Sequence, residues 1–116
     1  MTITRLQSAN RMSQIVKANG FVFLAGQVAK GAEGKPVADQ TAAILKAIDA
    51  LLQEAGTAKD KIVSATIWLT DISRFDEMNG VWDAWVAEGA SPARACVEAA
   101  LATPDYTVEI MVTATV

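Results

Sequence analysis

The pattern of apolar and polar positions divides the chain into segments typical of strands and of helices. Segments 13–18 and 21–26 are strand-like, and Asn19-Gly20 between them is a strong signal for a two-residue hairpin turn. Segment 62–70 alternates in the manner of a half-buried strand, and its apolar face comprises Val63, Ala65, Ile67 and Leu69.

Two further segments repeat apolar residues at the spacing of amphipathic helices. The first extends from about Asp39, its expected N-cap, to a stop at Gly56. Its apolar face comprises Ile44, Ile48, Leu51, Leu52 and Ala55. The second begins at Ser73, its expected N-cap, and ends at Gly89. Its buried side comprises Phe75, Met78, Val81, Trp82, Trp85 and Val86.

Two strand-like segments complete the chain, and each has a polar residue among small apolar ones. Arg94 lies in the segment after Pro92, and Glu109 lies in segment 106–116. We expect these two strands to pair through a turn at 102–105. The predicted order of elements is then β-β-α-β-α-β-β, and residues Ile3 to Leu6 are a candidate for an extra strand at the N-terminus. It predicts an α+β fold in which two helices cover one face of a mixed sheet.

The second face of this sheet needs a cover of its own. Two helices in so small a domain cannot hide every apolar strand residue of the set Ile15, Phe21, Phe23, Ile67 and Val112. Self-association would bury the remainder, so the pattern predicts a homo-oligomer.

Composition narrows the class of protein. The chain has 116 residues, of which 52% are hydrophobic and 20% charged, so we expect one domain over 1–116 with a packed core. The net charge of −3 argues against nucleic-acid binding, which uses a basic face. No apolar run approaches the roughly 18 residues of a membrane span, and the N-terminus lacks a secretory signal, so we expect a cytoplasmic protein without membrane contact.

The absence of histidine limits the available chemistry. It excludes Ser-His-Asp and Cys-His catalysis and histidine-ligated zinc. The single cysteine excludes an intramolecular disulfide. Catalysis would have to use carboxylates, arginine, a thiol, backbone groups and water.

Arg94, Cys96 and Glu109 form a candidate small-molecule site within the sheet. Arg94 and Cys96 point the same way because side chains alternate along a strand. The arginine could bind a carboxylate through its planar fork, or it could form a permanent ion pair with Glu98 or Glu109. Cys96 could line the site or act only as a small buried apolar residue.

The chain resembles the RidA/YjgF family of reactive-intermediate (enamine/imine) deaminases over nearly its whole length. Each matching piece is short, but they occur in the family order and at similar spacing. The matching pieces are Phe23-Leu24-Ala25-Gly26-Gln27, Gln40-Thr41, Thr66-Ile67-Trp68-Leu69-Thr70-Asp71, Phe75-Asp76-Glu77-Met78-Asn79, Pro92-Ala93-Arg94-Ala95-Cys96-Val97-Glu98 and Val108-Glu109-Ile110.

The resemblance implies a chorismate-mutase-like fold and a homotrimer with a β-barrel core and pockets at its subunit interfaces. It also implies hydrolysis of 2-imino and enamine acids to 2-keto acids and ammonia, with no metal or organic cofactor. Non-catalytic roles, such as binding small carboxylates or acting like a chaperone, are the alternative. Glu109 argues against a pure carboxylate binder, because such a protein has no use for an anion beside its ligand.

The resemblance also implies roles for individual residues. Arg94 would hold the substrate carboxylate, and Glu109 would orient the attacking water. Residues lining the pocket would be Cys96, Asn79, Gly26, Ala25 and Met12. Met12 and Ala25 stand where well-known members carry tyrosine and serine, and the loss of these hydroxyl groups leaves the preferred substrate open. The segment Trp82-Asp83-Ala84-Trp85 and Tyr106 point to a distinct branch of the family.

Overall fold

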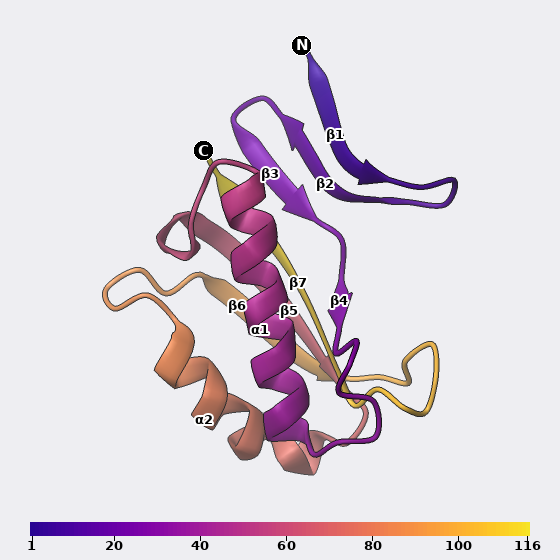
Figure 1. Ribbon diagram of the computed structural model, residues 1–116. Helices are drawn as coiled ribbons and strands as arrows, with labels where there is room; N and C mark the ends of the chain where they lie inside the picture. Colours follow the sequence, from indigo (N-terminus) through magenta and orange to yellow (C-terminus); the bar gives the residue numbers. More distant parts are fainter.

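A computed structural model describes residues 1–116, which form one mixed sheet and two helices (Figure 1). The predicted mixed α+β fold is confirmed, and so is the strand at the N-terminus. The strands are β1 (Ile3–Ser8), β2 (Ser13–Ala18), β3 (Phe21–Leu24), β4 (Gln27–Val28), β5 (Ile62–Leu69), β6 (Ala93–Glu98) and β7 (Val108–Thr115). The helices are α1 (Val37–Glu54) and α2 (Phe75–Trp85), with 3₁₀ turns at Lys59–Lys61 and Ile72–Arg74.

The strand order corrects the predicted pairing of the last two strands. The order is β1-β2-β3-β7-β5-β6, so β7 lies between β3 and β5, and β6 is an edge strand. The strand β6 pairs with β5 in parallel, from Ser64 opposite Ala93 to Leu69 opposite Glu98. The reason is that α2 connects β5 to β6 as a crossover helix, which makes neighbouring strands parallel. The segment after β6 then carries the chain past β5 to β7.

The predicted hairpin turn is confirmed. Asn19 and Gly20 join β2 to β3 with positive φ values of 52° and 81°. Both central residues of a type I′ turn need positive φ, which asparagine and glycine tolerate best. Antiparallel pairing of Ala18 with Phe21 follows directly from this two-residue loop.

The helix ends differ from the predictions at three of four positions. The helix α1 begins at Val37, before Asp39, and the Ala38 N–H donates to Glu77 Oε2 of α2 at 2.9 Å. A neighbouring helix therefore supplies the cap. The predicted stop at Gly56 is confirmed, and its N–H bonds to the Gln53 carbonyl.

The second helix starts later and ends earlier than predicted. Ser73 is not the N-cap of α2: its N–H donates to Asp71 Oδ1 at 3.0 Å, which opens the preceding 3₁₀ turn. The helix ends at Trp85 instead of Gly89, because Val86 turns to an extended ψ of 140°. Lys59 Nζ donates to the Trp85 carbonyl at this helix end at 2.6 Å.

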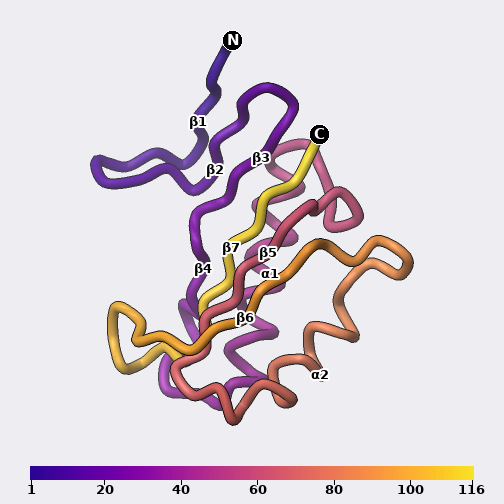
Figure 2. The backbone as a smooth tube through the Cα atoms, turned by 180° about the vertical axis from the view of Figure 1, so that it is seen from behind, coloured from indigo at the N-terminus to yellow at the C-terminus, as the bar shows by residue number.

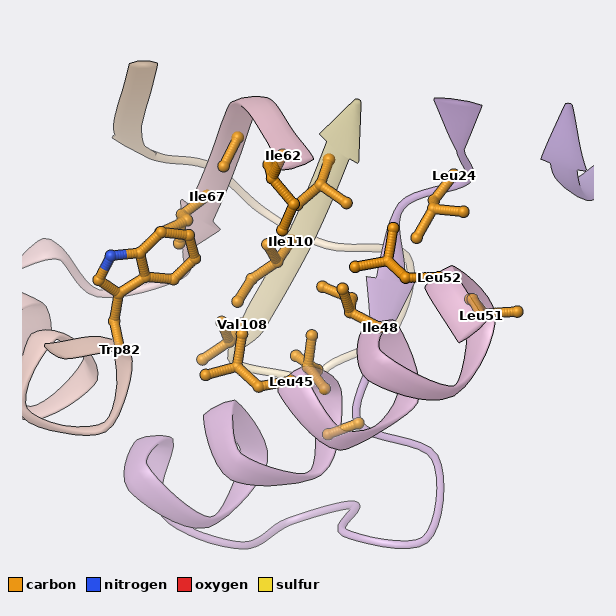
Figure 3. Packing of buried hydrophobic residues seen from close by; sticks show 14 of the residues in the cluster. Leu24, Leu45, Ile48, Leu51, Leu52, Ile62, Ile67, Trp82, Val108 and Ile110 are labelled. Atoms are coloured by element: carbon orange, nitrogen blue, oxygen red, sulfur yellow. The ribbon is translucent and has the colours of Figure 1, made fainter. Parts of the chain in front are cut away.

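The core lies between the two helices and one face of the sheet, which we call the helix-covered face (Figure 3). Ile48 and Leu52 of α1 point toward Ile110 of β7, and Trp82 of α2 points toward Ile67 of β5. The predicted apolar stripe of α1 is buried throughout. In β5 the prediction was wrong for Val63, which is 43% exposed, because a bulge between Ile62 and Ser64 shifts the alternation.

The opposite face of the sheet, which we call the open face, has no helix over it (Figure 2). Along β3, Val22 and Leu24 are buried, whereas Phe21 and Phe23 remain 38% and 44% exposed. The helices do bury Ile15, Ile67 and Val112. The expectation that two helices could not cover the whole set is therefore confirmed for the two phenylalanines.

Candidate functional site

Arg94 lies at the edge of the sheet and reaches across to α2. Its Nη1 donates a hydrogen bond of 2.7 Å to Asn79 Oδ1. Its Cζ lies 5.7 Å from the ring centroid of Phe75 and 5.3 Å from that of Trp82, which is within cation–π range. We call these four residues the arginine cluster. The structure thus brings together Arg94 and Asn79, two of the predicted site residues.

The arginine does not form the permanent ion pair that the sequence left open. Glu98 Oε1 instead accepts from the Ile72 N–H at 2.9 Å, and Glu109 is on the other face of the sheet. The one ion pair in the structure joins Arg74 to Glu77 at 3.7 Å. The positive charge of Arg94 therefore faces only a neutral amide and two aromatic rings.

Cys96 lies two residues from Arg94 on the same side of β6 and packs against the core. Burial raises the pKa of its thiol, and the nearby Arg94 charge opposes that rise. A raised pKa keeps the thiol protonated near neutral pH, which disfavours a nucleophilic role. The lining role expected for Cys96 stays a prediction.

Glu109 lies on the open face of β7, directly against the backbone of Gly26. A Cβ atom placed on Gly26 would lie 3.2 Å from Glu109 Cδ and closer still to Oε2. A side chain at this position would force the Glu109 carboxylate to move. The cross-strand neighbours of Glu109 are Trp68 on β5 and Val28 on β4. We call these four residues the carboxylate cluster.

Two glutamines connect Met12 to the strand end that carries Ala25. Gln27 Nε2 donates to Gln14 Oε1 at 2.8 Å and to the Ala25 carbonyl at 2.9 Å. Gln14 Nε2 in turn contacts Met12 Sδ at 3.9 Å. Ala25 directly precedes Gly26 of the carboxylate cluster in the chain, and the two glutamines join Ala25 to Met12. Sequence reasoning assigned no role to Gln14, although a glutamine beside the buried Ile15 of a strand was a detectable signal.

The two clusters do not meet within one chain. Arg94 points to the helix-covered side of an edge strand, while Glu109 points from the open face, with β5 between their strands. The largest surface cavity, of about 620 Å³, lies at the end of β6 and contains neither residue. Arg94 and Glu109 are therefore separated within one chain.

Other groups with shifted pKa values lie outside both clusters. Hydrogen bonds from Ser73 lower the pKa of Asp71. Backbone N–H groups lower the pKa of Glu33, and partial desolvation raises that of Tyr106, whose hydroxyl donates to Glu33 at 3.3 Å. No group of three or more acidic or cysteine side chains could hold a metal ion. Neither helix has the length and apolar character to cross a bilayer.

Comparisons with known proteins show to which family a chain with this fold and these residues belongs. Residues 2–116 match the family model described as Endoribonuclease L-PSP. A RutC family protein of Haemophilus ducreyi is 41% identical over 114 residues, which cover 98% of this chain and 97% of that protein. The RutC family protein YoaB of Escherichia coli is 40% identical over 116 residues and the full length of both.

Solved structures agree with the sequence relatives. A member of the YjgF protein family from Neisseria meningitidis has a TM-score of 0.95 at 49% identity and covers 99% of this chain and 95% of that one. A member of the conserved Rid protein family from Yersinia pestis has a TM-score of 0.86 at 35% identity, over 94% and 90% of the two chains. The chain belongs to this RidA/YjgF (Rid) family, as the sequence motifs predicted.

Proposed function

We propose that this protein hydrolyses reactive 2-imino and enamine acids to 2-keto acids and ammonia. The observation that carries the proposal is the state of Arg94: it is fixed by three side chains of α2 and neutralised by none. An arginine with an unpaired charge is suited to a carboxylate-bearing ligand. The match of almost the whole chain to the family supports the reaction class.

In the proposed reaction, Arg94 binds the substrate carboxylate and places the C=N carbon next to a water held by Glu109. Glu109 accepts a proton from the water as its oxygen bonds to that carbon. The electron pair of the C=N bond moves to nitrogen, which takes this proton from Glu109, and a carbinolamine results. Glu109 then transfers the hydroxyl proton of the carbinolamine to nitrogen, the C=O bond forms as the C–N bond breaks, and ammonia leaves with the electron pair of that bond. The other products are a 2-keto acid and the regenerated carboxylate. Such positioned acid–base help is typically worth about 10²–10⁴-fold.

A complete site requires a second copy of the chain. Because the arginine and carboxylate clusters lie on opposite faces of one sheet, we propose that a pocket forms where the arginine cluster of one subunit meets the carboxylate cluster of the next. A homotrimer of single-domain subunits gives three such pockets. Its barrel core would bury the open face, where Phe21 and Phe23 are exposed.

The remaining residues would line the pocket. Cys96, as a protonated thiol, and Asn79 would belong to the arginine side. Gly26, Ala25 and Met12 would belong to the carboxylate side, where Met12 is 52% exposed. The family description mentions an endoribonuclease, but the net charge of −3 does not favour RNA as the ligand here.

Trapping of imines tests the reaction directly. An amino-acid oxidase generates imino acids in situ, and semicarbazide traps those that survive. Added protein should suppress trapping, Arg94→Ala should abolish the suppression, and Glu109→Gln should reduce it by about 10²–10⁴-fold. Arg74→Ala is the matched control, because Arg74 is a surface arginine in an ion pair with 60% side-chain exposure.

Two results would contradict parts of the proposal. Unchanged trapping with imines from many amino acids, together with measurable binding of 2-keto acids, would favour the non-catalytic carboxylate-binding module. A monomeric mass by sedimentation at working concentrations, with activity retained, would contradict a pocket shared between subunits.

A further inference from the structure

Three side chains of the arginine cluster occupy one stripe of α2. Phe75, Asn79 and Trp82 stand at positions i, i+4 and i+7, which lie above one another on a helix. This stripe faces the guanidinium of Arg94 on β6. The aromatic-x-x-x-amide-x-x-aromatic spacing therefore surrounds a single arginine.

The contacts leave one edge of the guanidinium unoccupied. An arginine has five N–H donors in a planar fork, and Asn79 accepts from Nη1. Nε and Nη2 of Arg94 donate to no protein atom. Their shared edge has the geometry that binds both oxygens of a carboxylate at once.

We propose that Phe75 and Trp82 are positioning residues that act through Arg94. The two rings hold the plane of the guanidinium, so that its Nε–Nη2 edge is already turned toward the substrate carboxylate. A long arginine side chain otherwise loses much rotamer freedom when it binds a ligand. In this protein the side chain of Arg94 already loses this rotamer freedom when the chain folds. The nature of the ligand rests on the proposed function, whereas the hold on Arg94 does not.

Phe75 is the better residue for a test, because it is 37% exposed and Trp82 is only 4% exposed in the core. Phe75→Leu keeps an apolar side chain but removes the ring. We expect KM for the imino acid to rise about 2- to 5-fold, from the cation–π range at exposed sites, with kcat unchanged. Phe75→Tyr keeps the ring and should restore KM.

A control separates this effect from a general loss of packing at the start of α2. Ile72→Ala removes an apolar side chain of 42% exposure from the preceding turn, and Ile72 is not one of the three residues of the arginine cluster that hold Arg94. KM should remain at the wild-type value in this variant. An equal rise of KM in Ile72→Ala and Phe75→Leu, or no rescue by Phe75→Tyr, would overturn the proposal.

A second measurement is independent of the reaction. The ¹⁵N order parameter of Arg94 Nε should be high in the wild type and in Phe75→Tyr, and it should fall in Phe75→Leu. An order parameter that stays the same in Phe75→Leu would overturn the positioning role. If the protein did not suppress imine trapping, the proposed hydrolysis would be wrong. The order parameter would still show whether Phe75 holds Arg94 in place.

Discussion

The helix-covered face and the open face of the sheet use the same strands but different partners. On β7, Val108, Ile110 and Val112 point to the helices and are at most 1% exposed. The residues between them point to the open face, and Met111 among them is 40% exposed. The helix-covered face packs against apolar side chains of the same chain, whereas no element of the chain covers the open face.

This difference separates stability from the candidate chemistry. Buried aliphatic residues of the helix-covered face contribute about 1.5–3 kcal/mol each. Glu109 and the exposed phenylalanines lie on the open face, and Arg94 lies at the sheet edge beside α2. A polar group at such positions avoids the cost of full burial, so it can remain available to a ligand or to a second subunit.

Gly26→Ala should have the largest effect, and the effect should be on activity. The new Cβ would displace the Glu109 carboxylate, because it would lie 3.2 Å from Cδ and closer to Oε2. We expect imine hydrolysis to fall by about 10²–10⁴-fold, the usual contribution of a positioned acid–base group. The trapping assay measures it.

Gly80→Ala is the matched control for that change. Gly80 lies in α2 with no heavy atom near the position of an added Cβ, so activity should be retained. The helix should gain about 0.5–1 kcal/mol of stability. Full activity in Gly26→Ala would mean that the position of Glu109 is not important for the reaction.

Substitutions of two adjacent residues of β7 allow the contributions of the two faces to the unfolding free energy to be compared. Ile110→Ala on the helix-covered face should cost about 2–5 kcal/mol of unfolding free energy, since Ile110 is fully buried. Urea denaturation at several protein concentrations measures this loss, which should not depend on concentration. Any loss in Met111→Ala should be smaller and concentration-dependent, because it would come from association. A concentration-independent loss of equal size in both variants would contradict the distinction between the faces.

Phe23→Glu tests whether the open face is buried between subunits. A fully buried phenylalanine contributes about 1.5–3 kcal/mol, so subunit affinity should fall by about 10- to 150-fold. Sedimentation over a dilution series measures it. Ala50→Glu on the exposed side of α1 is the control and should leave the mass unchanged. An unaltered mass for Phe23→Glu at every dilution would rule out this surface as the interface.

The smallest effect concerns the ionisation of Cys96 at the sheet edge. Burial raises the pKa of its thiol, so alkylation by iodoacetamide should increase only at higher pH than for a free cysteine. Arg94→Met removes the charge that opposes this rise and should move the profile further upward. Because the folded pKa lies above the unfolded one, this group should lower stability only as pH rises above the ordinary pKa of cysteine. A profile shifted downward in Arg94→Met would refute the assignment.

Local signals predicted much of the fold. Asn19-Gly20 predicted the hairpin because positive φ is a property of those two residues. The spacing of Ile44, Ile48 and Leu51 predicted the buried side of α1 because helical periodicity is local. The family motifs also gathered the candidate site residues into one list. They did not show that these residues form two separate clusters.

Contacts between distant segments account for several of the errors. The cap of α1 by Glu77 and the end of α2 near Lys59 depend on residues far away in the chain. Strand order was mistaken for the same reason: a turn at 102–105 looks the same from sequence whether β7 joins β6 or passes to the far side of β5.

The sequence by itself determined most of the elements, the apolar stripe of α1 and the residue types available for chemistry, because these depend on neighbours within a few positions. In α2 the predicted buried side was wrong for Phe75, which is 37% exposed. Only the tertiary structure decided that β5 separates Arg94 from Glu109, that α2 surrounds Arg94 and that Gly26 makes room for Glu109. The physical reason is that strand order and close packing depend on segments tens of residues apart, whose contacts no local pattern specifies.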